Sequence, residues 1–323
     1  MTEGMIPNPD LDPMAAAEST RGAMGRRVFT QAAIGVAAAG LAAGLTGWSA
    51  VRHRDEGERE PSEFSRNIVA RRTPDPLPRD PGAGPWKSME ALDISLEPQR
   101  MIEPRLSRDP GITNVQLRTM HNGKEIGFHV SWEDPDRSDR EVAAQFRDSV
   151  AIQLPVNPEG PAFTVMGQPG RPVHLLHWRA SWQRAMDKAT LATNTIRDAF
   201  PNAVSDVSPE DVFKPELAQK YYPAQVAGNA MAERKRTSPV EELVAEGFGT
   251  ITSQAEQRAE GFGVYSGGRW EVVLIVPMAG KENQVSLHPG GHTSVAVAVW
   301  NGGKGDRGAR KQFAYWSGLE LGT

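Results

Sequence analysis

The sequence predicts a mainly β fold, an antiparallel β-sandwich that carries a long, partly helical insertion. Short segments in which apolar and polar residues alternate recur between residues 92 and 300. Such alternation is typical of strands with one buried face. Clusters of glycine, proline, asparagine and aspartate separate the segments. These turn signals favour antiparallel strands over strands joined by long crossover helices.

The clearest local signal is a hairpin near the start of the alternating region. Residues 113–120 alternate, Asn122-Gly123 is a signature of two-residue hairpin turns, and residues 125–132 form the return strand. The other predicted strands are 92–96, 149–155, 173–180, 269–277 and 294–300.

Residues 181–249 interrupt this pattern and predict an insertion between strands. Residues 182–195 lack β-branched alternation and are expected to be helical. A short helix is predicted over residues 239–246, with Ser238 as N-cap and Glu241 three residues later. A long insertion of this kind usually has a function, and we expect it to cover a face of the sandwich.

The N-terminal residues 1–53 predict a targeting segment. Arg26 and Arg27 precede an alanine-rich apolar run at residues 32–51, the order found in twin-arginine export signals. An uncleaved membrane anchor is the alternative, because about 20 residues can span a bilayer. Either interpretation places the rest of the chain on the far side of the membrane, in the periplasm or anchored facing it.

A proline-rich, charged stretch follows at residues 54–90 and predicts an extended linker. The folded domain is therefore expected to occupy residues 91–323.

Composition and the absence of motifs exclude several functions. A net charge of −4 argues against nucleic acid as the main partner. The chain has no cysteine, which excludes disulfides, iron–sulfur clusters and covalent c-type haem. No motif of a serine hydrolase, zinc protease or phosphate-binding loop is present. His174 and His177 are three residues apart in a predicted strand, so they point to opposite faces and cannot chelate one metal. We therefore predict no catalytic residues.

Three segments of the C-terminal third carry a family resemblance: residues 238–250, 267–277 and 295–303, the last continuing into 308–311. Together they resemble the haem b (gamma) subunit of the type II dimethyl sulfoxide reductase family, which includes ethylbenzene dehydrogenase, dimethyl sulfide dehydrogenase, selenate reductase and chlorate reductase. The resemblance spans roughly residues 115–316. It implies a fold like the cytochrome domain of cellobiose dehydrogenase, with one non-covalent haem b at one end of the sandwich.

The resemblance also implies a function and partners. The chain would be a non-catalytic subunit that transfers electrons between the iron–sulfur subunit of a molybdenum enzyme and a cytochrome c-type partner. The molybdopterin subunit of the same complex would hold the catalytic centre. Subunits of this kind accompany both hydrocarbon oxidases and oxyanion reductases, so the substrate and the direction of electron flow stay open.

Two residues match the axial haem ligands of that family. Taken alone, Met166 is more often a core methionine that fills a gap. The resemblance implies that Met166, which precedes Gly167 and the strand at residues 173–180, is one ligand. A lysine near the C-terminus would be the other, and Lys311 fits better than its competitor Lys304. Only a neutral amine can bind iron, so the pKa of this lysine must fall from about 10.4.

Three further residues are candidates for the haem pocket. Arg171 and Arg179 could pair with the haem propionates, and Trp178 could form part of the pocket wall.

Two other functions remain as alternatives to the haem protein. One is a carbohydrate-binding module that uses Trp178, Trp182 and Trp270 as an aromatic platform. The other is a membrane-tethered structural subunit without haem, for which Met166 and Lys311 would point away from each other.

Overall fold

The computed structural model describes residues 67–104, 111–141, 144–157, 166–187, 223–229 and 236–323. The chain divides into two compact units, residues 1–60 and 61–323, and all described residues belong to the second. The predicted targeting segment at residues 1–53 and most of the predicted insertion lie outside the described residues. Within the described ranges, no helix is both long and apolar enough to cross a membrane.

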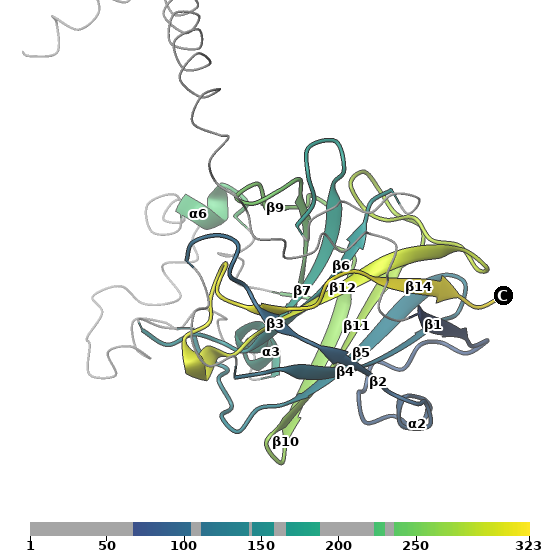
Figure 1. The fold of residues 1–323 in the computed structure, drawn as a ribbon, viewed down its shortest axis with the longest axis horizontal. Coiled ribbons are helices and arrows are strands. Elements are labelled where there is room, and N and C mark those ends of the chain that lie inside the picture. The colour runs from purple at the N-terminus through teal and green to yellow at the C-terminus, as the bar shows by residue number, and fades with distance from the viewer. Residues whose placement is uncertain (1–66, 105–110, 142–143, 158–165, 188–222, 230–235) are drawn as a thin grey trace, which may run out of the picture. The chain divides into compact units, whose positions relative to one another are not determined.

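The described unit is mainly β, as the sequence predicts, and its strands form two layers (Figure 1). The first layer has the strand order β10-β11-β5-β4, with β2 paired to β4. Its strands are β10 (Glu260–Ser266), β11 (Arg269–Pro277), β5 (Glu125–Glu133), β4 (Asn114–His121) and β2 (Leu92–Ser95).

The second layer has the order β9-β8-β7-β6-β12, with β13 paired to β12 and β3 paired to β13. Its strands are β9 (Thr252–Ser253), β8 (Val240–Ala245), β7 (Val173–Arg179), β6 (Ser149–Pro155), β12 (His292–Trp300), β13 (Gln312–Phe313) and β3 (Glu97–Pro98). All pairs in this layer are antiparallel.

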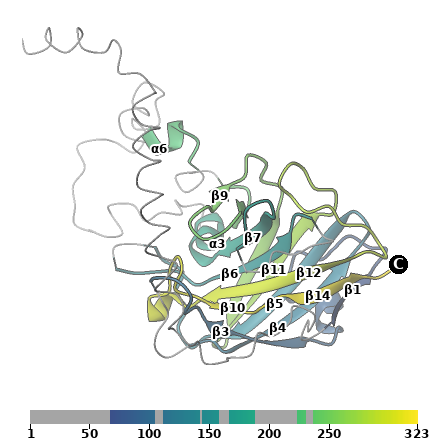
Figure 2. The same ribbon diagram turned by 45° about the horizontal axis from the view of Figure 1, so that its top comes forward.

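The two layers are joined at one edge by β1 (Asn67–Arg72) and β14 (Ser317–Leu321), which lie side by side in Figures 1 and 2. β1 pairs with β14 through its first four residues and with β4 through its last two, and both pairings are parallel. β14 also pairs with the first half of β12. The predicted antiparallel pairing does not hold at this edge, where β1 runs in the same direction as both of its neighbours.

The core lies between the layers because alternate residues of each strand point inward. Phe128 and Leu274 of the first layer belong to the same buried cluster as Ile152 and Leu176 of the second. Each such side chain contributes roughly 1.5–3 kcal/mol when fully buried. The seven strands predicted from alternation are all present, and their ends differ from the prediction by at most two residues.

The predicted linker is wrong between residues 67 and 90. This stretch contains β1 and the short helix α2 (Gly84–Lys87), whose Trp86 is fully buried. Trp86 packs in a cluster with Val273 and Ile275 on the outer face of the first layer. The prolines of this stretch fix the backbone without preventing it from packing against a sheet, so the folded body begins before residue 91.

The predicted helix at residues 239–246 is also wrong, because this segment is strand β8. Ser238 does not cap a helix; its hydroxyl accepts a hydrogen bond from the N–H of Val240 at 3.1 Å. Six residues of β8 pair with β7. This strand pairing is more stabilising than a helix cap would be, because the capping signature is not followed by apolar residues at helical spacing. The helix predicted from residue 182 is described only as far as α3 (Ala180–Asp187). Another short helix, α6 (Pro223–Val226), lies within the range predicted as an insertion.

Candidate functional site

A cavity of about 570 Å³ lies over the outer face of the second layer. The residues of β6, β7 and β8 that point away from the core form its floor. The sequence led us to expect a site at one end of the sandwich, whereas this cavity rests on the face of a sheet. The floor residues are Ser149, Ala151, Leu175, His177, Arg179, Glu241 and Leu243.

Met166 and Lys311 meet in this cavity although they are 145 residues apart in the sequence. Met166 lies in the connection that leads into β7, and Lys311 directly precedes β13. The Nζ atom of Lys311 donates a hydrogen bond to the Sδ atom of Met166 at 3.4 Å. The two residues predicted as a ligand pair therefore present their donor atoms to each other.

The protonation of Lys311 is shifted by its surroundings. Burial lowers the pKa of the Lys311 ammonium to about 8, because a buried site disfavours the charged form. The centre of the Trp300 ring lies 5.3 Å from Nζ. A lowered pKa gives this amine a free electron pair at a pH where an exposed lysine is protonated.

Lys304 occupies a different position. It is the last residue of a 3₁₀ turn, Gly302–Lys304, and its backbone N–H donates to the side chain of Asn301 at 2.9 Å. Its side chain is exposed, and Lys304 is not among the residues that line the cavity. Of the two candidate lysines, only Lys311 approaches Met166.

One wall of the cavity carries buried cationic and polar groups. The guanidinium group of Arg179 forms an ion pair with Glu241, and that of Arg147 pairs with Glu141 at 2.9 Å. His177 stacks on Trp300 with 4.7 Å between ring centres.

Several buried nitrogen atoms of this wall remain without a partner among the described residues. These atoms are Nε and Nη1 of Arg179, Nε of Arg147 and Nε2 of His177. Burial, together with the charges of Arg179, Arg147 and Lys311, holds the pKa of His177 well below its usual value, so this imidazole is neutral. An acceptor group in the cavity, such as a carboxylate, would satisfy the guanidinium donors of Arg147 and Arg179.

Of the remaining residues predicted for the haem pocket, one lines the cavity and two do not. Arg179 lines the cavity, whereas Arg171 lies exposed in the turn before β7 and does not line it. Trp178 lies in the core with Trp132 and Trp270, on the face of β7 opposite to the cavity. The pocket-wall role predicted for Trp178 is therefore wrong.

Sequence reasoning missed Arg147 and His177 at this site. The period of two along β7 offered a signal for His177, because Arg179 and His177 share one face of that strand.

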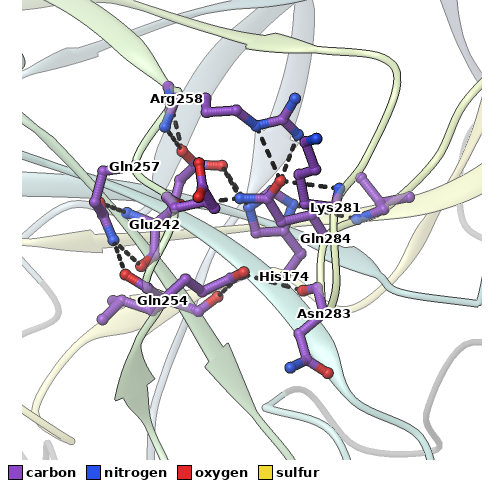
Figure 3. A network of polar contacts seen from close by, with 12 residues as sticks. His174, Glu242, Gln254, Gln257, Arg258, Lys281, Asn283 and Gln284 are labelled. Carbon is purple, nitrogen blue, oxygen red and sulfur yellow. Dashed lines mark hydrogen bonds and ion pairs between the residues drawn. The ribbon is translucent and has the colours of Figure 1, made fainter.

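The other face of β7 and β8 carries a polar network that fixes two loops (Figure 3). The carboxylate of Glu242 accepts hydrogen bonds from His174 at 3.1 Å, from Gln284 at 3.0 Å and from the N–H of Ala259 at 2.7 Å. The N–H of Arg258 also donates to it. Burial raises the pKa of Glu242, but these donors outweigh burial and hold the pKa below its usual value.

In this network Nδ1 of His174 accepts from the N–H of Val285 at 3.4 Å, while its Nε2 faces Glu242. His174 and His177 thus point to opposite faces of β7, as predicted. The described residues contain no group of three histidine, aspartate or glutamate side chains arranged to hold a metal ion.

Comparison with known proteins identifies a family and a similar protein. A family model described as ethylbenzene dehydrogenase matches residues 83–312. A protein of Haloferax mediterranei named "Putative respiratory nitrate reductase heme subunit ORF7" is 23% identical over 248 residues, which cover 76% of this chain and 69% of that protein.

Two solved structures of a family 9 carbohydrate-binding module from Caldicellulosiruptor kristjanssonii also align with the chain. The complex with glucose is 10% identical and has a TM-score of 0.38, covering 80% of this chain and 97% of the module. The complex with cellotriose is 10% identical and has a TM-score of 0.39, covering 80% of this chain and 94% of the module.

Proposed function

Because the chain belongs to the ethylbenzene dehydrogenase family, we propose that it is a haem b subunit that transfers electrons within a respiratory oxidoreductase. The family match over residues 83–312 agrees with the resemblance carried by residues 238–250 and 295–311. The name of the Haloferax relative, a heme subunit, supports a haem cofactor.

The observation that carries the proposal is the contact between Met166 and Lys311. A thioether sulfur and an amine nitrogen lie 3.4 Å apart in a cavity, brought together from positions 145 residues apart. A methionine that only fills a gap would not need a buried lysine beside it, and a lysine loses solvation energy by being buried there. A metal that binds both atoms accounts for this pairing.

The surroundings of the pair fit a haem. The cavity volume of about 570 Å³ falls within the range of about 300–1,000 Å³ for small-molecule and cofactor sites. Leu175, Leu243 and Ala151 give the floor an apolar surface for a porphyrin face. The unpartnered donors of Arg147 and Arg179 suit the two propionates.

Met166 and Lys311 would have different roles in binding the haem iron. The soft thioether of Met166 would stabilise ferrous iron and raise the reduction potential. Lys311 would bind through its neutral amine, which burial makes accessible by lowering the pKa to about 8. If Met166 and Lys311 both held the iron, the haem would supply single-electron transfer and would leave no place for substrate to bind. The chain would therefore be a non-catalytic subunit.

We extend the proposal to the partners and the compartment. The chain would relay electrons between the iron–sulfur subunit of a molybdenum enzyme, whose molybdopterin subunit is catalytic, and a cytochrome c-type partner. The twin-arginine segment before residue 54 supports export to the periplasm or anchoring on that side. A fold like that of the cellobiose dehydrogenase cytochrome domain belongs to the same proposal.

The haem-free alternatives have less support. Trp178, Trp182 and Trp270 are all buried, whereas a sugar-binding platform needs exposed aromatic rings. Met166 and Lys311 approach each other instead of pointing apart, which disfavours a structural subunit that has lost its haem.

The experiment that tests the proposal is a reduced-minus-oxidised absorption spectrum of the purified chain, with a pyridine haemochrome assay. We expect a low-spin b-type spectrum and about one haem per chain. A folded chain that stays colourless after expression with added haem would contradict the proposal.

A further inference from the structure

We propose that Gln153 is a positioning residue, which holds the backbone of Met166 so that the thioether faces Lys311. Gln153 lies on β6, on the side of the second layer that carries the cavity. This inference rests on the proposed function, because a fixed thioether matters when it binds a metal.

The backbone of Met166 needs such support. Its φ angle is 83°, in the left-handed region that residues other than glycine rarely occupy. A conformation of this kind costs roughly 1–3 kcal/mol and persists only where the surroundings impose it.

Contacts from two strands impose this conformation. The N–H of Met166 donates to Oε1 of Gln153 at 3.0 Å, and its carbonyl accepts from the N–H of Gly247 at 2.8 Å. Gly167 follows with a φ of 80°, and a Cβ at this position would lie 2.6 Å from the carbonyl oxygen of Ala245. The turn is therefore pressed against the end of β8, and Gln153 is the side chain that fixes it from β6.

The orientation of the Gln153 amide follows from the donor that it meets. A backbone N–H can only donate, so the side-chain atom that faces Met166 must be the oxygen. The Nε2 atom of Gln153 is then a buried donor without a partner among the described residues. Gln153 and Lys311 line the same small hollow beside Trp300. A buried unsatisfied donor costs about 1–3 kcal/mol, a cost that a gap-filling apolar residue would avoid.

Three variants separate this role from a general effect on stability. Gln153→Leu removes the acceptor, and Gln153→Glu keeps an acceptor oxygen in place. Gln183→Leu is the matched control, because Gln183 is also buried and its Oε1 accepts the N–H of Gly263 at 2.9 Å, away from the cavity. If Gln153→Leu does not fold, Gln153→Asn shortens the side chain and serves the same purpose.

The first readout is the ¹³C-methyl methionine NMR spectrum of the haem-free protein, with the Met166 signal assigned through Met166→Leu. We expect Gln153→Leu to shift and broaden the Met166 signal, while Gln153→Glu and Gln183→Leu leave it near its wild-type position. A wild-type Met166 signal in folded Gln153→Leu, or in folded Gln153→Asn, would overturn the inference.

The second readout is haem titration followed by absorption. Gln153→Leu is expected to weaken haem binding by about 10- to 100-fold, the usual effect of losing a residue that orients a ligand. Gln153→Glu is expected to bind more tightly than Gln153→Leu, and Gln183→Leu to bind as the wild type does. A wild-type protein that binds no haem, but whose Met166 signal responds to Gln153→Leu, would refute the proposed function and leave the positioning role standing.

Discussion

At the residue scale, Lys311 combines burial with a charge, and this combination affects stability before any cofactor binds. Folding lowers the pKa of Lys311 from about 10.4 in an unfolded chain to about 8. Between these two values the unfolded chain binds more protons, so stability rises with pH across this interval. Below about pH 8 both states are protonated, and the full cost of burying the charge is present.

We predict that Lys311→Met stabilises the haem-free protein by about 1–3 kcal/mol at pH 7, since one pKa unit corresponds to about 1.4 kcal/mol. The gain should shrink as the pH rises to about 10. Urea denaturation of both proteins at several pH values measures this difference. A gain that stays constant with pH would contradict the burial of a charged amine.

In the haem-bound protein, we predict that replacing Lys311 disrupts the haem site instead of providing a benefit. Lys311→Ala should convert the low-spin spectrum to high-spin at neutral pH, because one axial ligand is lost, and acidification of the wild type should do the same by protonating the amine. Lys304→Ala is the control, since Lys304 does not line the cavity. Loss of the low-spin spectrum in Lys304→Ala alone would show that the ligand assignment is wrong.

Residue patterns alone could not predict the meeting of Met166 and Lys311. Their positions are 145 residues apart, and no period along one strand links them. The family resemblance supplied the pair, whereas strand alternation could have supplied His177 beside Arg179. Alternation along β7 also places Trp178 on the core face, so the same period could have prevented the prediction that Trp178 lines the pocket.

At the scale of elements, β8 shows how tertiary pairing overrides a local signal. The segment has a helix-capping signature, yet it pairs with β7 on one side and β9 on the other. The side chains of its two neighbouring glutamates therefore point to opposite faces of the sheet. Glu241 lines the cavity, and Glu242 belongs to the polar network. A helix would place neighbouring residues about 100° apart and could not divide them in this way.

We predict that Glu242→Ala destabilises the protein by about 3 kcal/mol or more, because several buried donors lose a charged acceptor. Hydrogen exchange should show the loss of protection at Arg258 and Ala259, whose N–H groups bind this carboxylate. Glu246→Ala, at an exposed position on the same segment, is the control and should change stability by less than about 0.5 kcal/mol. Equal effects of the two substitutions would contradict the role of the network.

At the scale of the whole folded unit, the edge formed by β1 and β14 was the part least accessible to sequence reasoning. β1 is short, follows a charged stretch and pairs in parallel with partners from distant parts of the chain. Parallel pairs lack the hairpin turns that reveal antiparallel neighbours. Seven of the antiparallel strands, by contrast, followed from local alternation and turns: β2, β4, β5, β6, β7, β11 and β12.

We predict that a chain starting at residue 91 is far less stable than one starting at residue 67. The shorter chain lacks β1 and Trp86, and the loss of a buried tryptophan side chain alone costs about 3–5 kcal/mol. Typical total stabilities are only about 5–15 kcal/mol. Thermal unfolding by circular dichroism compares the two chains, and equal melting temperatures would show that residues 67–90 are a linker after all.

The long sequence separation of Met166 and Lys311 has a kinetic consequence. Contacts between distant residues form late, because the chain must first lose the entropy of closing a large loop. We therefore expect the contact between Met166 and Lys311 to form only after β6, β7 and β12 have assembled. We expect haem to enter a finished pocket, so haem added during refolding should leave the folding rate unchanged and should slow only unfolding.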